Sequence, residues 1–456
     1  MPPSVFKQND PYQYLTGFGN YHESQAIKNT IPVAQNSPQR LPYGLYTEKL
    51  SGTAFTVPRV ENQHSWLYRI LPTASHDRWE ELSQLAVGSG ISASHENSTR
   101  THQELKFTPD QLLFEPFDIQ DSHDWVSGSR HLAGAGDPMM KTGIAIYVFT
   151  AGKDMPPKQA YYSSDGDLLI VLQYGVMDVQ TELGRLLIRP NEILVIPRGI
   201  RYRVTLPEGP IRGYSLELFQ GHFKLPELGV IGSSGLANAR DFQIPTANYE
   251  QDTISRWSII SRFNGKLWQL HQDHSPFDVV AWHGMYYPYK YDLGRFNSIN
   301  SVSYDHIDPS IYTVLTAPSP YPGVAVVDFA FFPKRWTVQE DTFRPPWYHR
   351  NTMAEFSAMI SASVDMSRST GLRPGGAQLH NIMSGHGPDV RVFEKASNEA
   401  LVPRKDGHDV QVFMFETSLM LGTTEWGLVE SKKVRESYRA EKWQPLKVNF
   451  QPPEDA

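Results

Sequence analysis

Apolar residues in this sequence occur mainly in short runs rich in β-branched and aromatic side chains. Two of the clearest are GIAIYVFT, from Gly143 to Thr150, and VAVVDFAFF, from Val324 to Phe332. Runs of this kind are typical of strands buried in a sheet. A membrane-spanning helix needs about 20 consecutive apolar residues, so these runs predict buried strands and not membrane spans.

The clearest series of strands is predicted between Tyr161 and Thr205. Turn dipeptides separate its apolar segments at intervals of roughly 8–10 residues, which is typical of a β-sandwich or barrel. These dipeptides are Asp165-Gly166, Tyr174-Gly175, Leu183-Gly184, Pro190-Asn191 and Arg198-Gly199. The stretch from Arg189 to Gly199 looks like a cupin strand pair. Because residues 161–205 contain no histidine, a cupin at this place would carry no metal.

Helical signals are weaker than strand signals. Residues 80–85 suggest one or two helical turns, and residues 351–361 suggest either a short helix or a strand. The Gly- and Pro-rich segment 206–250 predicts a long ordered connection. A new series of β segments begins after Tyr291, which predicts a domain boundary near residue 293. We therefore expect a large, metal-free N-terminal β domain over 1–293 and a smaller C-terminal domain over 294–456.

The composition narrows the possible chemistry. The chain has 456 residues, with 42 basic and 49 acidic side chains, so its formal net charge is 42 − 49 = −7, and it has no cysteine. The lack of cysteine excludes a disulfide framework, a zinc finger, an iron–sulfur cluster and a thiol nucleophile. The mildly negative charge, without basic blocks, argues against nucleic-acid binding. The N-terminus lacks the apolar core of a signal peptide, so a cytoplasmic location is expected.

Histidine and carboxylate side chains remain as candidate metal ligands. Five of the 16 histidines fall in the stretch 283–386, namely His283, His306, His349, His380 and His386. Two histidines and one carboxylate on one face of a barrel leave coordination positions open, which suits non-haem Fe(II). Glu355 follows His349 by six residues, and an even spacing on one strand points both side chains to one face. Spacing alone does not choose between His380 and His386 as the third ligand. The alternative is that these histidines cap turns.

His306 is a candidate general base, because Asp305 precedes it directly. An aspartate beside an exposed histidine can orient the imidazole and raise its pKa toward the working pH. The alternative is that His306 is a solvated histidine in a loop, since neighbours in sequence need not be in contact.

Short blocks of sequence, spread in order along nearly the whole chain, carry a family resemblance. They are LTGFGN at 15–20, LSGTAFT at 50–56, SWLYRILP at 65–72, SDGD at 164–167, GLAN at 235–238, VAWHG at 280–284, PYKY at 288–291, DPS at 308–310, RPP at 344–346 and HGPD at 386–389. Through these blocks the chain resembles the homogentisate 1,2-dioxygenase family. Matches of this length and order are highly specific.

The resemblance implies a mostly β, bicupin-like jelly-roll or β-sandwich fold with few short helices, whose C-terminal domain holds Fe(II). Matched position by position, His349, Glu355 and His386 would ligate the iron, and His306 would be the general base near the substrate hydroxyl. This match decides against His380 as a ligand and makes it a residue that supports the ligands. Asp305 and Tyr348 are also expected to support the site. The residues expected beside the substrate are His386, His380, Ser361 and Val364.

The resemblance also implies a reaction and partners. Both atoms of O₂ would enter homogentisate, a hydroquinone, and the ring would open between the hydroxyl-bearing and side-chain-bearing carbons. The product would be 4-maleylacetoacetate, in tyrosine and phenylalanine catabolism. The expected partners are therefore a small aromatic substrate and O₂, together with further copies of the chain in a homo-oligomer, a hexamer or a trimer.

Three positions after Glu355 depart from the family pattern. The family's substrate-binding Tyr falls on Val364, its Arg on Ser361 and its His on Ser363. Fewer polar donors weaken the binding of an acidic substrate, because its charge is left under-paired. One hypothesis is therefore a paralogous dioxygenase acting on a less acidic hydroquinone or phenolic ring. Alternatively, another residue or subunit supplies the contacts and the substrate is homogentisate. A third hypothesis, a non-catalytic bicupin scaffold, has no need of an intact His/Glu/His set.

Overall fold

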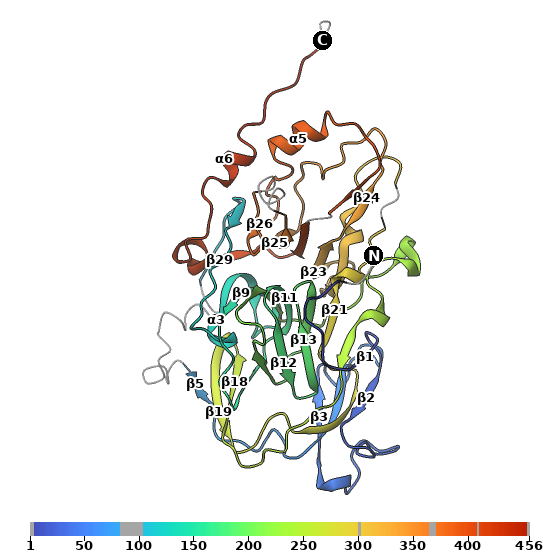
Figure 1. Ribbon diagram of the computed structural model, residues 1–456, viewed down its shortest axis with the longest axis vertical. Helices are drawn as coiled ribbons and strands as arrows, with labels where there is room; N and C mark the ends of the chain where they lie inside the picture. Colours follow the sequence, from blue (N-terminus) through green and yellow to red (C-terminus); the bar gives the residue numbers. More distant parts are fainter. Residues whose placement is uncertain (1–3, 83–103, 300–301, 364–370, 408–409, 454–456) are drawn as a thin grey trace.

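The computed structural model describes residues 4–82, 104–299, 302–363, 371–407 and 410–453. Strands dominate these residues, and the helices are few and short (Figure 1). The helices are α3 (Trp125–Gly128), α5 (Val390–Ala396), α6 (Tyr438–Lys442), the π-helix Trp426–Glu430 and the 3₁₀ turns Pro42–Gly44, Gly229–Ser234, Ala239–Asp241, Leu293–Arg295 and Pro309–Tyr312. Within the described residues, no helix has the length and apolar character needed to cross a membrane.

Two large sheets make up most of the N-terminal part. The first sheet has, in spatial order, β1 (Tyr14–Thr16), β17 (Gln243–Pro245), β21 (Tyr289–Asp292), β14 (Glu192–Ile196), β11 (Asp167–Tyr174), β16 (Ile211–Leu218), β9 (Thr142–Ala151), β8 (Ser129–Asp137), β29 (Gly422–Thr424) and β6 (Leu105–Lys106). The second sheet has β13 (Gly184–Ile188), β12 (Met177–Thr181), β15 (Tyr202–Thr205), β10 (Gln159–Ser163), β18 (Trp257–Phe263), β19 (Lys266–Gln272) and β5 (Glu80–Glu81).

The eight strands from β9 to β16 form a jelly roll. They pair antiparallel in nested order: β9 with β16, β10 with β15, β11 with β14, and β12 with β13. Nested pairs shared between two sheets are the pattern of the double-sheet jelly roll of cupins. The prediction of a mostly β, cupin-type fold with few short helices is therefore confirmed.

Three smaller sheets complete the molecule. A four-stranded sheet has the order β2 (His22–Gln25), β20 (Val279–Gly284), β4 (His64–Arg69) and β3 (Tyr46–Ser51). A six-stranded sheet in the C-terminal part has the order β22 (Thr313–Pro318), β23 (Ala325–Phe332), β28 (Val410–Thr417), β25 (Ala354–Ala362), β26 (Ala377–His380) and β7 (Leu112–Phe114). The third sheet pairs β24 (Arg335–Thr337) with β27 (Arg404–Asp406).

The two faces of the six-stranded sheet differ in chemistry. Phe356 and Phe415 are cross-strand partners, as are Phe415 and Phe329, and all three rings are fully buried. The residues next to these phenylalanines are Glu355, Glu416 and Asp328, which are partners in the same way. Glu355 and Asp328 precede their phenylalanines, and Glu416 follows Phe415 because its strand is antiparallel to the other two. Because side chains alternate along a strand, one face contributes to the core and the other carries a row of carboxylates.

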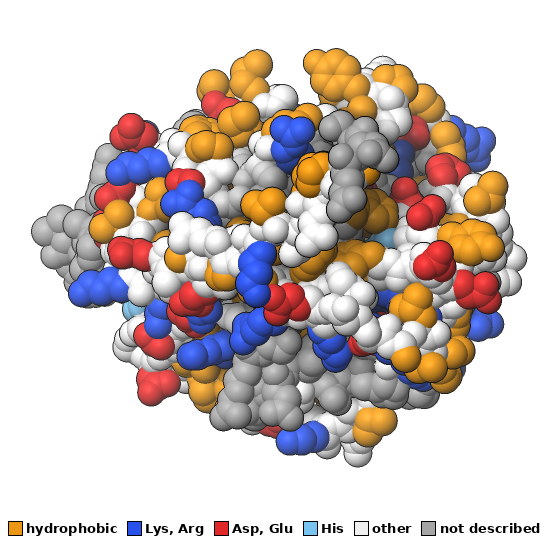
Figure 2. Space-filling model, turned by 90° about the horizontal axis from the view of Figure 1, so that it is seen from above, with side chains coloured by type: hydrophobic (Ala, Val, Ile, Leu, Met, Phe, Trp, Pro, Cys, Tyr) orange, Lys and Arg blue, Asp and Glu red, His pale blue; other side chains and the backbone are white. Residues whose placement is uncertain are grey.

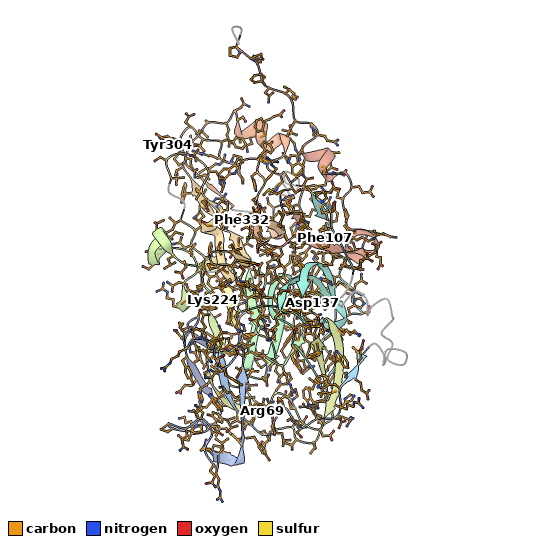
Figure 3. All side chains as sticks on the ribbon, turned by 180° about the vertical axis from the view of Figure 1, so that it is seen from behind. Arg69, Phe107, Asp137, Lys224, Tyr304 and Phe332 are labelled. Carbon is orange, nitrogen blue, oxygen red and sulfur yellow. The ribbon has the colours of Figure 1, made fainter. Side chains whose placement is uncertain are left out.

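The N-terminal part contains a buried charge cluster around Arg69. The guanidinium of Arg69 is fully buried and donates to Asp278 (2.7 Å), Glu182 (3.0 Å) and Glu48 (2.9 Å). Removing one partner from such a cluster typically costs about 3–5 kcal/mol, because it leaves a buried charge unpaired. Arg69 lies in the half of the molecule away from Tyr304 and Phe332 (Figure 3). The cluster therefore belongs to the scaffold and not to the carboxylate face.

Most of the predicted strands are present. The two apolar runs form β9 and β23, and residues 351–361 supply a strand, β25, and not a helix. The prediction that 206–250 is a connection was wrong in two places. Strand β16 lies in this segment and pairs with β9 and β11, and β17 lies in it and pairs with β1 and β21. Of residues 80–85, Glu80 and Glu81 form strand β5 where a helical turn was expected, and 83–85 lie outside the described residues.

Candidate metal centre

Two loops place His349 and His386 side by side. The backbone N–H of His349 donates to the carbonyl of His386 (2.9 Å), and that of His386 donates to the carbonyl of His349 (3.1 Å). This isolated bridge brings the two ring centroids to 4.1 Å. His349 lies before the first residue of β25, so its position is fixed by the bridge to His386 and not by that strand. The argument from the even spacing of His349 and Glu355 on one strand therefore does not apply.

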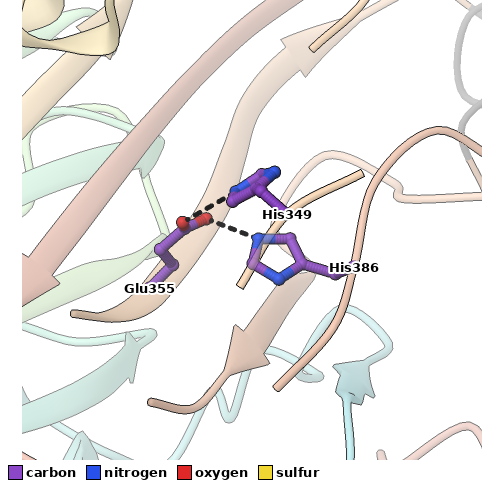
Figure 4. Close-up of side chains that lie close together, drawn as sticks. All are labelled: His349, Glu355 and His386. Atoms are coloured by element: carbon purple, nitrogen blue, oxygen red, sulfur yellow. Dashed lines mark hydrogen bonds and ion pairs between the residues drawn. The ribbon is translucent and has the colours of Figure 1, made fainter. Parts of the chain in front are cut away.

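Glu355, the second residue of β25, faces both histidines. Its Oε2 lies 3.1 Å from His386 Nε2, and its Oε1 lies 3.4 Å from His349 Nε2 (Figure 4). The ligand atoms of the three residues all lie within 4.8 Å of one another. The structure thus brings together the three residues that the sequence resemblance implied as ligands.

Backbone carbonyls fix the orientation of both imidazoles. The Nδ1–H of His349 donates to the Trp347 carbonyl (2.9 Å), and the Nδ1–H of His386 donates to the Ser384 carbonyl (2.9 Å). A carbonyl only accepts, so Nδ1 of each ring carries a proton, and Nε2 is the atom that can offer a lone pair to a metal. Carbonyl acceptors of this kind commonly orient metal-bound histidines. Two such nitrogens and one carboxylate form a donor set that fits a divalent metal ion.

The surroundings of Glu355 keep its carboxylate in the charged form. Burial alone would raise its pKa, but the hydrogen bonds from His349 and His386 outweigh burial and hold the pKa well below its ordinary value. The hydrogen bond to Glu355 in turn raises the pKa of His349. The centre therefore contains a carboxylate that carries its negative charge without protonation, as a metal ligand must.

A second carboxylate lies next to Glu355 on the sheet. Burial, together with the charges of Glu355 and Asp328, raises the pKa of Glu416 to about 7. Burial also raises the pKa of Asp328, against a hydrogen bond with Thr316. The carboxylate face thus places an acid that titrates near neutrality beside the candidate ligands.

His380 lies behind the ligands. Its ring stacks on His386 with the centroids 4.1 Å apart, and its Nε2 lies 3.1 Å from the hydroxyl of Tyr438. The Tyr438 hydroxyl donates to Gln378 Oε1 (3.0 Å), so it accepts from the Nε2–H of His380. Burial lowers the pKa of His380 well below its ordinary value, so the ring is neutral. These contacts place His380 against a candidate ligand and outside the group of ligand atoms.

His306 approaches the centre through Trp347. The two rings make an edge-to-face contact with the centroids 5.3 Å apart. The expectation that Asp305 orients His306 and raises its pKa was wrong. The Nδ1–H of His306 instead donates to the Ile307 carbonyl (2.8 Å), while Asp305 is exposed and has a positive φ of 68°. Burial lowers the pKa of His306, which keeps its imidazole neutral.

A cavity of about 670 Å³ opens beside the two histidines. Its lining consists of Gln111, Trp347, Tyr348, His349, Arg350, Gly385, His386, Trp443 and Leu446. This volume is within the range of about 300–1,000 Å³ that is common for small-molecule sites. Tyr348, expected to support the site, lines this cavity. Ser361 is exposed and donates to Gln411 (2.7 Å), and Val364 lies outside the described residues.

Sequence reasoning missed three residues of the centre. Asn351 donates through Nδ2 to Glu355 Oε1 (2.8 Å). Tyr438 and Trp443 come from the C-terminal segment, where Trp443 donates to the Gly387 carbonyl (3.3 Å) next to His386. Asn351 could have been found from its place just before a strand, since asparagine is typical of such turns. No local signal indicates Tyr438 or Trp443, because their partners are distant in sequence.

The fold and the site together define a class of protein: a mostly β, jelly-roll protein with a centre of two histidines and one carboxylate suited to a metal ion. Residues 13–293 match the model for the N-terminal part of homogentisate 1,2-dioxygenase, and residues 294–450 match the model for its C-terminal part. The chain belongs to the homogentisate 1,2-dioxygenase family.

Relatives along the full length agree with this assignment. The chain is 56% identical over 457 residues to homogentisate 1,2-dioxygenase of Emericella nidulans, with 100% of both chains covered. It is 47% identical over 447 residues to homogentisate 1,2-dioxygenase of Homo sapiens, with 96% of this chain and 97% of the relative covered. Among solved structures, protein Ylba from E. coli is similar over 70% of this chain and 95% of its own, at 8% identity and a TM-score of 0.29. The relatives give no support to a different substrate or to a non-catalytic scaffold.

Proposed function

We propose that this protein is an Fe(II)-dependent dioxygenase that inserts both atoms of O₂ into homogentisate and opens its ring to 4-maleylacetoacetate, in tyrosine and phenylalanine catabolism. The observation that carries the proposal is the group of His349, Glu355 and His386, whose ligand atoms lie within 4.8 Å of one another in a chain of this family. The donor set contains no sulfur and leaves coordination positions open, as non-haem iron requires.

His349, Glu355 and His386 would hold the iron, and the bound ion would supply the open positions at which substrate and O₂ meet. The residues around these open positions would orient the substrate. His306 keeps its proton on Nδ1, bonded to the Ile307 carbonyl, so its Nε2 is the basic atom that would accept the proton of a substrate hydroxyl. Its lowered pKa supports this role, since a base must be unprotonated at neutral pH.

The cavity supports binding of an aromatic acid. Trp347, Tyr348 and Trp443 provide flat apolar surfaces for a ring, and Arg350 is the cation among its lining residues. The Arg350 side chain lies over Gly385, since its Cγ would be 3.7 Å from a Cβ on that glycine, and His386 is the next residue. Among the described residues, no carboxylate pairs with Arg350. A substrate carboxylate could therefore take this guanidinium as its partner, in place of the Arg, His and Tyr that the family pattern has where this chain has Ser361, Ser363 and Val364.

The remaining features of the proposal concern organisation. Residues 1–293 would form the metal-free scaffold and residues 294–456 the iron-bearing domain. We propose that the protein lies in the cytoplasm.

We also propose that the protein is a homo-oligomer, a trimer or a hexamer. Figure 2 looks onto the C-terminal end of the molecule and shows hydrophobic side chains on that surface. Several exposed ones belong to the C-terminal part, including Tyr304, Trp336, Trp347 and Met383. Contiguous exposed apolar patches often mark protein–protein contacts, so this end of the molecule is our candidate for the subunit interface.

The decisive experiment is an oxygen-uptake screen of the Fe(II)-loaded protein against homogentisate, gentisate and uncharged alkylated hydroquinones. We expect homogentisate to be consumed fastest, with one O₂ taken up per molecule. Faster use of an uncharged ring would overturn homogentisate as the substrate. Failure of the purified protein to bind Fe(II) anaerobically would overturn the dioxygenase as a whole.

A further inference from the structure

The two oxygens of Glu355 have different surroundings. Oε2 lies 3.1 Å from His386 Nε2, its one hydrogen-bond partner among the described residues. Oε1 faces His349 Nε2 at 3.4 Å and also accepts a hydrogen bond of 2.8 Å from the side-chain amide of Asn351. The shortest contact of the carboxylate is thus made by a residue that is not among the candidate ligands.

The orientation of the Asn351 amide is fixed on both sides. The backbone N–H of Met353 donates to Asn351 Oδ1 (2.7 Å), so the oxygen of the amide points to Met353 and the NH₂ group points to Glu355. The backbone carbonyl of Asn351 accepts from the N–H of Met383 (2.9 Å), three residues before His386. Asn351 therefore connects the turn before β25 with the segment that carries the second histidine.

We infer that Asn351 is a positioning residue that leaves Glu355 a single oxygen, Oε2, to offer to a metal ion; this inference rests on the proposed function. His349 and His386 can exchange their hydrogen bonds to Glu355 for bonds to a metal, because each Nε2 can release a proton and offer a lone pair. The Asn351 NH₂ group is a donor only, so it keeps its bond to Oε1 when the metal is present.

A single coordinating oxygen matters for the reaction. Two histidines and a carboxylate that offers one oxygen would take up three positions of a six-coordinate ion, and three positions would stay open for the substrate and O₂. A bidentate carboxylate would take one of these positions. Asparagine suits the role because an aspartate would place a second negative charge against Glu355, and a serine could accept from Met353 but is too short to donate to Glu355.

Two substitutions of Asn351 distinguish its role as a hydrogen-bond donor to Glu355 from its role in the turn before β25. Asn351→Ser keeps an acceptor for the Met353 N–H and removes the donor to Glu355. Asn351→Asp keeps the shape and replaces the donor with a charge. Asn398→Asp is the matched control, because Asn398 is exposed at the end of α5 and its amide donates to the Glu394 carbonyl. Co(II) is the probe, since its affinity can be measured by chelator competition and its visible absorption weakens as the coordination number rises.

Asn351→Ser and Asn351→Asp are expected to bind Co(II) about 10–100-fold more weakly than the wild type. The spectrum of Asn351→Ser should also shift toward a higher coordination number, whereas Asn398→Asp should match the wild type in both measurements. Affinity within twofold of the wild type, with an unchanged spectrum, would overturn the inference. These measurements use no substrate, so an inactive but Co(II)-binding wild type would refute the proposed function and leave this inference standing.

A measurement on the unmutated protein covers the case in which the variants do not fold. The infrared difference spectrum of the wild type with and without Zn(II), with ¹³C-labelled glutamate to assign the bands, reports how Glu355 binds. A wide separation of the two carboxylate stretching bands is expected for one coordinating oxygen. A narrow separation, as for two coordinating oxygens, would contradict the role of Asn351.

Discussion

Glu416 allows a direct test of the charge arrangement beside the metal centre. Its cross-strand partners are Glu355 and Asp328, and its pKa is raised from 4.5 to about 7 by burial and by these two charges. A difference of 7 − 4.5 = 2.5 in pKa corresponds to about 3 kcal/mol, at ~1.36 kcal/mol for each tenfold change. Two unit charges on neighbouring strands, about 5 Å apart, repel by about 3 kcal/mol at an effective dielectric constant of ~20. Repulsion of this size is large enough, together with burial and against the attraction of His349, to give the raised pKa of Glu416.

The sign follows from the raised pKa. The folded protein favours protonated Glu416, so the stabilisation is fully present below the unfolded pKa of 4.5 and is lost as the pH rises through about 7. Glu416→Gln imitates the protonated carboxyl at every pH. In the metal-free protein, the variant is expected to match the wild type near pH 4.5. It should exceed the free energy of unfolding of the wild type by up to about 3 kcal/mol at pH 8.

Urea denaturation of both metal-free proteins across this pH range measures the difference. The exposed Glu436→Gln serves as the control and should stay within about 0.5 kcal/mol of the wild type throughout. If the advantage of Glu416→Gln is the same at pH 5 and pH 8, the charges of Glu355 and Asp328 do not act on Glu416, and the reasoning fails.

Three further predictions concern the site. His349→Ala should abolish iron retention, measured by metal analysis after gel filtration, and surviving activity would refute its assignment as a ligand. Arg350→Gln should lower kcat/KM for homogentisate about 10–100-fold, the value of one or two charge-assisted hydrogen bonds. The same change should leave the uncharged methyl ester unaffected, and an equal loss for both compounds would exclude an ion pair. Val364→Tyr should improve use of homogentisate if its loop sets recognition of the acid, and unchanged kinetics would count against that hypothesis.

The strands that could be predicted are those with continuous apolar sequence. Residues 143–150 are buried on both faces, and most of residues 324–332 are buried, so both runs contain few polar residues and are visible in the sequence. Strand β16 was hidden, because it lies inside a Gly- and Pro-rich segment and contains Gly213. That glycine is required by packing: a Cβ there would lie 2.3 Å from the Val171 carbonyl oxygen and 2.5 Å from Phe149. The glycine content of this segment suggested a loop, but Gly213 is present because the strands around it pack too closely for a side chain.

The residues of the metal centre could be listed from the sequence, but their geometry could not. The resemblance selected His349, Glu355 and His386, whereas spacing left His380 as an equal candidate. What separates the two histidines is the partner of each Nε2. That of His386 faces Glu355, while that of His380 faces Tyr438, 58 residues further along the chain. Such a partner is set by the tertiary structure, so no local pattern can reveal it.

The supports of the centre come from two separate segments, the turn before β25 and the C-terminal segment, and this distribution links metal binding to folding. Asn351 holds Glu355 from the turn before β25, Tyr438 holds His380 from α6, and Trp443 holds the carbonyl of Gly387 beside His386. Metal ligands rarely stay in place in an unfolded chain, so binding free energy becomes folding free energy. Here a metal would replace the contacts between Glu355 and the two histidines, and it would thereby stabilise the bridge between their loops. The C-terminal segment, which contacts both His380 and the loop of His386, would be stabilised with it.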